Sequence, residues 1–126
     1  MGVNYDTGVL LSAERGERTT WSRHRGLLIV GAVPVVSAPV LAQAWRGGSR
    51  QALLARFLAG CEVEAMTPAQ ARATGELLGA AGRADIVDAA VVESAIRHGN
   101  AILTADRRDI ERLVSAGGRH LVVEEV

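Results

Sequence analysis

The chain has 126 residues, of which 48% are apolar, and its 14 basic residues, all of them arginine, balance 14 acidic residues to a formal net charge of zero. This composition argues against a disordered chain and predicts one packed domain over residues 1–126, in which any binding of nucleic acid needs a local basic patch. Cys61 is the only cysteine, which excludes an internal disulfide and a cysteine-based zinc cluster. The N-terminus has no signal-peptide pattern and no apolar run is long enough to span a membrane, so we expect a cytoplasmic protein.

Short apolar runs alternate with helical patterns along the chain. Glycine, proline and capping residues set the expected boundaries. In chain order the expected elements are a strand at 3–5, a helix at 8–13, a helix from Thr19 or Thr20 to about residue 30, a strand at 34–36, a helix from an N-cap at Ser37 to Gly47, a helix at 50–58, a strand at 62–65, a helix from Thr67 to residues 79–82, a helix from Asp85 to Gly99, a strand at 101–104, a helix at 109–115 and a strand at 120–123.

This order predicts an α/β fold. The strands are expected to be buried and non-alternating, which is typical of a parallel sheet that is covered by helices on both faces. Functional sites of such sheets form at the carboxyl ends of the strands.

Three acidic residues lie where this rule places a site. Asp6 follows the first strand, Asp106 follows the strand at 101–104, and Asp88 lies in the first turn of the helix that begins near Asp85. If the first and fourth strands are neighbours, the three carboxylates meet and repel one another. A hard divalent cation, Mg²⁺ or Mn²⁺, relieves that repulsion and promotes hydrolysis of a phosphodiester.

Each acid also has an ordinary structural interpretation. Asp85 fits a helix N-cap, and Asp88 then resembles the second member of a capping box. Asp6 fits a turn, while Asp106 and Asp109 fit caps of the following helix. The acids would then belong to an unrelated α/β domain.

Three motifs in order resemble the PIN-domain family, and in particular the toxins of the VapC type. The first is residues 6–11, an aspartate followed by the small polar residue Thr7 and an apolar helix start. The second begins at Asp88 and runs through Val92 to residues 98–99. The third is residues 103–106, in which the hydroxyl of Thr104 precedes the last acid by two residues.

The resemblance implies a three-layer α/β/α fold with a parallel sheet of about five strands. It also implies a ribonuclease that uses Mg²⁺ or Mn²⁺, forms a homodimer and is blocked by an antitoxin protein. Asp6, Asp88 and Asp106 would then be the catalytic metal ligands, Thr104 would orient a ligand or water, and Asp109 would be an auxiliary acid.

One position departs from the family pattern. Gln43 stands where the family usually has a glutamate, in the helix after the second strand, and a neutral amide lowers the expected affinity for metal. A catalytically degenerate module that binds RNA or protein is therefore the alternative. Glu14, at the end of the first helix, is a weak candidate to supply the carboxylate that Gln43 lacks. Arg46 lies three residues after Gln43, on the same helix face, where it either reaches a scissile phosphate or is a helix-end cation.

Other residues carry weaker signals. Arginines that can contact an RNA backbone, or be ordinary surface charges, are Arg23, Arg25, Arg50 and Arg56. Trp21 and Trp45 can stack on bases, although packing in the core or a dimer is the commoner role. The histidines have no metal-ligand spacing, and the sequence contains no nucleophile elbow, P-loop or dinucleotide fingerprint.

Overall fold

A central parallel sheet organises the protein. Within residues 2–82 and 84–126, which a computed structural model describes, the sheet has five strands in the order β3-β2-β1-β4-β5. The strands are β1 Val3–Tyr5, β2 Val35–Ser37, β3 Glu62–Glu64, β4 Ala101–Thr104 and β5 Val123–Glu125. All four strand pairs are parallel, and β1 pairs with β4 through Val3 with Ala101 and Tyr5 with Leu103.

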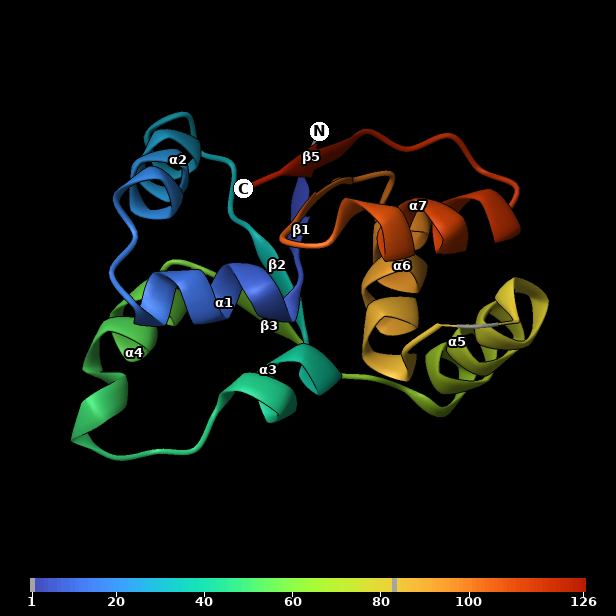
Figure 1. The fold of residues 1–126 in the computed structure, drawn as a ribbon, viewed down its shortest axis with the longest axis horizontal. Coiled ribbons are helices and arrows are strands. Elements are labelled where there is room, and N and C mark those ends of the chain that lie inside the picture. Colours follow the sequence, from blue (N-terminus) through green and yellow to red (C-terminus); the bar gives the residue numbers. More distant parts are fainter. Residues whose placement is uncertain (1, 83) are drawn as a thin grey trace.

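Helices connect successive strands and cover both faces of the sheet. They are α1 Thr7–Glu14, α2 Arg18–Ile29, α3 Ala38–Ala44, a short 3-10 helix η1 Ser49–Gln51, α4 Ala52–Ala59, α5 Pro68–Ala81, α6 Ile86–His98 and α7 Arg107–Ala116. Figure 1 shows α1, α2 and α4 on one side, and α5, α6 and α7 on the other. The predicted three-layer α/β/α architecture is confirmed.

The strand order reverses at β1. The first half of the chain adds β2 and β3 on one side of β1, and the second half adds β4 and β5 on the other. In open parallel sheets ligands bind in the crevice at such a reversal, beyond the carboxyl ends of the strands. Helix α3 lies at this end and packs against both α1 and α6.

The core forms around the central strands and the inner helix faces. Its largest fully buried side chains include Tyr5, Leu10, Leu54, Phe57 and Ile102. Helix α6 is buried from Ala89 to Val92, because it lies between the sheet and the helices α5 and α7. That apolar run fixes the first turn of α6 at the carboxyl ends of the strands.

The start of α2 differs from the prediction. The helix begins at Arg18 with Glu17 in the N-cap position, so neither Thr19 nor Thr20 is the cap. The hydroxyl of Thr20 is buried and lies 2.6 Å from the hydroxyl of Ser12. Thr20, which resembles a cap in the sequence, therefore links α2 to α1 through a side-chain hydrogen bond.

The last strand also lies later than predicted. It covers Val123–Glu125 instead of 120–123, and it pairs with β4 from Ile102 to Thr104. Because β5 is an edge strand, its two glutamates remain exposed to solvent, and the apolar run before them does not mark the paired segment.

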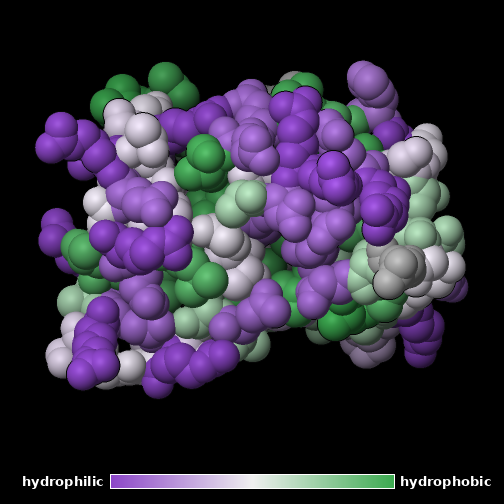
Figure 2. Space-filling view, viewed as in Figure 1, coloured by the Kyte–Doolittle hydropathy of each residue, from purple (hydrophilic) through white to green (hydrophobic). Residues whose placement is uncertain are grey.

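Apolar side chains are also exposed at one end of α2. Figure 2 shows a hydrophobic patch there, where Ile29 and Val30 are 83% and 76% exposed. None of the helices in residues 2–82 and 84–126 combines the length and the apolar character that crossing a membrane requires.

Candidate active site

Asp6 is held by groups from the start of α1 and the end of β4. It follows β1 directly and is only 3% exposed. Its Oδ1 accepts the backbone N–H of Val9 at 3.0 Å, which caps α1, and its Oδ2 accepts the hydroxyl of Thr104 and the backbone N–H of Ala105. Burial raises the pKa of Asp6, and these hydrogen bonds offset part of that rise. The carboxylate is therefore fixed in one orientation.

Thr104 joins the loops that follow β1 and β4. It is fully buried, and its hydroxyl donates to Asp6 while accepting the backbone N–H of Asp106 at 2.8 Å. Asp106 in turn caps α7, with its Oδ1 3.5 Å from the backbone nitrogen of Asp109. Helix α7 therefore begins at Arg107, two residues before the predicted start.

Asp85 and Asp88 bring a third element to the same region. Asp85 is the N-cap of α6, because its Oδ1 accepts the backbone N–H groups of Val87 and Asp88 at 2.7 and 3.2 Å. The cap interpretation of Asp85 is confirmed. The capping-box interpretation of Asp88 is wrong, since among the described residues its side chain makes no return hydrogen bond to the N–H of Asp85.

The carboxylate of Asp88 is instead exposed to the charge of the other aspartates. The pKa of Asp88 is raised to about 6, mainly by burial and further by the negative charges of Asp85, Asp6, Asp109 and Asp106, in that order. The charges of the other aspartates therefore act on Asp88, as expected for acids that follow the neighbouring strands β1 and β4.

All five aspartates of the sequence lie in this region, which we call the acidic edge: Asp6, Asp85, Asp88, Asp106 and Asp109. The ion pairs formed among residues 2–82 and 84–126 involve none of them. The acidic edge is thus a concentration of negative charge without a neutralising cation from these residues.

Gln43 lies beside the acidic edge. Its side-chain Oε1 accepts the hydroxyl of Thr7 at 2.6 Å, and Thr7 directly follows Asp6. Gln43 is therefore near the position that the family pattern gives to a glutamate, with one lone pair of its oxygen already engaged. Glu14 is not available in the same way, because it accepts a hydrogen bond from the amide of Gln51 at 2.6 Å.

Arg46 does not share a helix face with Gln43. Helix α3 ends at Ala44, and the Arg46 guanidinium donates to the carbonyl oxygens of Ala42 and Trp45 at 3.2 and 2.7 Å. The prediction of a shared face is wrong, because the helix stops before the arginine. These contacts are those of a cation at a helix C-terminus.

The acidic edge suits a hard cation in its chemistry. Its donors are carboxylate oxygens with the amide oxygen of Gln43 nearby, the ligands that Mg²⁺ and Mn²⁺ prefer. Among the residues described, however, no three His, Cys, Asp or Glu side chains stand close enough together to hold a metal ion. Asp88 and Asp106 are more exposed than Asp6.

Comparison with known protein families agrees with this arrangement. The family model described as PIN domain matches residues 5–114, which include the whole acidic edge. This chain belongs to the PIN-domain family. No curated protein is significantly similar to this PIN domain in sequence.

Solved structures share the fold over nearly its full length. A chain of VapBC2 from Rickettsia felis, bound to a promoter DNA fragment, is 19% identical with a TM-score of 0.77, and the match covers 100% of this chain and 99% of that one. A chain of DNA-bound VapBC from Salmonella typhimurium is 18% identical in sequence with a TM-score of 0.72, and the match covers 99% of this chain and 98% of that one. A chain of a toxin–antitoxin complex from Klebsiella pneumoniae is 16% identical in sequence with a TM-score of 0.68, and the match covers 86% of this chain and 89% of that one.

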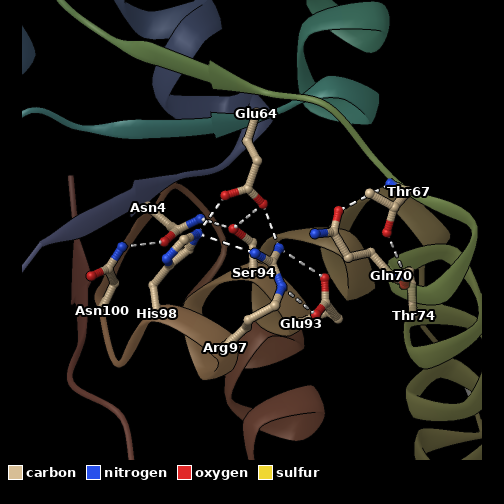
Figure 3. Close-up of polar contacts among 10 residues, drawn as sticks. All are labelled: Asn4, Glu64, Thr67, Gln70, Thr74, Glu93, Ser94, Arg97, His98 and Asn100. Atoms are coloured by element: carbon tan, nitrogen blue, oxygen red, sulfur yellow. Dashed lines mark hydrogen bonds and ion pairs between the residues drawn. The ribbon is translucent and has the colours of Figure 1, made fainter.

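A second polar cluster, which the sequence did not reveal, joins β3 to the C-terminal half of α6. Figure 3 shows Glu64 accepting from Ser94, Arg97 and His98. Burial alone would raise the pKa of Glu64, but the hydrogen bonds and charges of Arg97 and His98 lower it overall. The hydroxyl of Ser94 also accepts the amide of Asn4 at 2.9 Å. Ser94 is buried and its hydroxyl donates a hydrogen bond to the carboxylate of Glu64. The cluster therefore has a structural role, which is to link β3 to α6.

Proposed function

We propose that this PIN-domain protein is a toxin of the VapC type, an endoribonuclease that depends on Mg²⁺ or Mn²⁺ and cleaves RNA phosphodiester bonds. The observation that carries the proposal is the acidic edge: five aspartates, without a cation partner among the described residues, at the strand-order reversal of a PIN fold. The fold shared with VapBC toxin–antitoxin complexes supports the toxin assignment.

The side chains of the acidic edge have distinct roles in this proposal. Asp6, Asp88 and Asp106 hold the metal ion, which when bound supplies a Lewis acid for the phosphoryl oxygen and lowers the pKa of a water molecule. Thr104 orients Asp6 through the hydrogen bond to its Oδ2. Asp85 and Asp109 add negative charge that favours a divalent cation.

Thr7 and Gln43 complete one side of the proposed site. The hydroxyl of Thr7 donates to the amide oxygen of Gln43, which in this proposal is a neutral group where an acid would strengthen metal binding. We therefore propose a site with one metal ion, and we expect Gln43→Glu to lower the Mn²⁺ concentration needed for half-maximal cleavage.

Exposed apolar surface supports the proposed protein partners, a cognate antitoxin and a second copy of this chain. Besides the end of α2, a groove of about 300 Å³ is lined by Leu41, Trp45, Ala55, Leu58 and Val63. Trp45 and Val63 are 41% and 43% exposed, and contiguous apolar surface of this kind marks interaction sites.

The second candidate function is a degenerate module that binds RNA or protein without cleaving it. Two observations favour it: the neutral Gln43, and the lack of a preassembled group of three metal ligands among the described residues. A binding module retains its RNA affinity in EDTA, whereas a nuclease needs the metal for turnover.

The deciding experiment is cleavage of transfer, ribosomal and messenger RNA by the purified protein with Mn²⁺, Mg²⁺ or EDTA. Asp6→Asn is compared with Glu76→Gln, which removes one exposed carboxylate from α5. We expect metal-dependent cleavage that Asp6→Asn abolishes and Glu76→Gln preserves. Cleavage that persists in EDTA or in folded Asp6→Asn protein would refute the proposal of a metal-dependent nuclease site at Asp6.

A further inference from the structure

Three arginines and a tryptophan line a groove on the opposite end of α1 from the acidic edge. The groove has a volume of about 490 Å³ and is lined by Gly16, Arg18, Trp21, Arg25, Leu53 and Arg56. We call it the arginine groove. Arg18, Trp21 and Arg25 recur at spacings of three and four residues, so they share one face of α2. Leu53 and Arg56 face them from α4.

The arginines of this groove have no ion-pair partner among residues 2–82 and 84–126. Arg18, Arg25 and Arg56 are exposed, and none of them forms an ion pair or hydrogen bond with another residue in 2–82 or 84–126. Two neighbouring arginines differ, because Arg15 pairs with Glu17 and Arg23 pairs with Glu124. Unpaired guanidinium groups bind phosphate through two parallel hydrogen bonds.

Trp21 provides a fixed aromatic surface in the same groove. Its indole Nε1–H donates to the carbonyl oxygen of Ala13 at 3.0 Å, and its ring meets Phe57 edge-to-face with centroids 5.1 Å apart. The ring is only partly buried, so one side remains open to the groove. Because the Trp21 indole is held in place beside unpaired arginines, a nucleobase can stack on the indole while its phosphate binds an arginine.

Helix α1 connects the two regions. Its first residue follows Asp6, and Gly16, in the loop after its last residue, lines the groove. Eight residues at about 1.5 Å each span roughly 12 Å, a distance that a few nucleotides bridge. The acidic edge repels phosphates, so RNA that reaches it needs cations elsewhere on the surface.

We propose that the arginine groove binds single-stranded RNA, with Arg18, Arg25 and Arg56 on the backbone phosphates and a base on Trp21. The inference rests on the proposed function for the identity of the ligand, and adds where the substrate is held. An acidic peptide would use the three arginines but not the tryptophan, which is why RNA is the ligand we infer.

The test measures binding of a fluorescein-labelled, mixed-sequence 12-mer RNA in EDTA by fluorescence anisotropy. The double variant Arg25→Gln/Arg56→Gln is compared with Arg72→Gln/Arg119→Gln, which removes the same charge from exposed arginines elsewhere. We expect the groove variant to raise Kd about tenfold or more and to reduce the slope of log Kd against log salt by about 1.4, at roughly 0.7 for each lost phosphate contact. The control should change Kd less than twofold.

Fluorescence of Trp21 distinguishes RNA from peptide. The chain has two tryptophans, so in a Trp45→Phe background the emission comes from Trp21 alone. Quenching by RNA supports the proposal. An equal loss of affinity in both double variants, no quenching, or tighter binding of polyglutamate than of RNA would overturn it.

These outcomes are independent of cleavage. If wild-type protein cleaves no RNA with any metal while the groove variant alone loses RNA binding, the proposed nuclease fails and the groove stands. If Asp6→Asn abolishes cleavage while the groove variant binds RNA normally, the nuclease stands and the groove fails.

Discussion

Replacing Asp88 with asparagine should stabilise the folded protein at neutral pH in the absence of metal. The carboxylate of Asp88 is held among four other aspartates, and its pKa is raised from 3.8 to about 6. At about 1.4 kcal/mol for each pKa unit, keeping this group ionised costs about 3 kcal/mol at most. Because Asp88 is partly exposed, solvent screening reduces the effect to about 1–2 kcal/mol.

The sign of the pH dependence follows from the raised pKa. Between the unfolded value near 4 and the folded value near 6 the native state binds more protons, so the stability of the wild type falls as pH rises through this range. The loss is complete above the folded pKa. Asp88→Asn removes it, so the variant should gain stability at pH 8 and little at pH 4.

Thermal unfolding followed by circular dichroism in EDTA measures this difference. For a chain of this size a gain of 1–2 kcal/mol corresponds to a rise in Tm of about 4–8 °C at pH 8. Glu76→Gln serves as the control, since it removes a carboxylate from exposed surface. A variant that melts lower than the wild type at pH 8, or gains equally at both pH values, would refute the argument that the acidic edge is under electrostatic strain.

Three further predictions concern the packing around the site. Thr104→Val should destabilise the fold by about 1–3 kcal/mol in urea titrations and weaken cleavage, while Thr104→Ser preserves both, because the buried hydroxyl serves two partners. Burial lowers the pKa of His24, so the wild type should lose stability as pH falls below about 6.5, and His24→Gln should lose less over the same range. Gly8→Ala should lower the free energy of unfolding in urea titrations by about 1–3 kcal/mol, since an added Cβ would lie 2.4 Å from that of Ala105. Gly75→Ala, on an open helix face, should raise that free energy by about 0.5–1 kcal/mol.

Each of these has a result that contradicts it. A Thr104→Val protein as stable as the wild type would mean that the hydroxyl is not needed to join the two loops. Equal acid sensitivity of wild type and His24→Gln would assign the effect to other groups. Similar changes for both glycine variants would remove close packing as the cause.

The sequence was most informative where local chemistry decides the structure. Apolar runs located β1 and β4, and a capping side chain located α6 at Asp85. Because parallel strands align their carboxyl ends, the convergence of Asp6 and Asp106 followed once β1 and β4 were neighbours.

The sequence did not predict contacts between segments that are distant along the chain. Nothing local distinguishes Thr20 as a buried partner of Ser12 from an ordinary cap. Glu64 meets Arg97 only because β3 lies at the sheet edge next to α6, a pairing separated by 33 residues. The arginine groove likewise combines α2 with α4, so its arginines read singly as surface charges.

The hydrogen bond between Thr104 and Asp6 has a consequence for synthesis of the chain. It joins groups 98 residues apart, and β1 cannot gain β4 as its neighbour until that late strand has been made. A ribosome-bound chain that lacks residue 104 therefore has an Asp6 carboxylate without its orienting partner. Since such long-range pairings need both partners, the acidic edge forms only after residue 104 has been made. The proposed nuclease would therefore stay inactive until that point of its synthesis, which would give the proposed antitoxin time to bind the nascent protein.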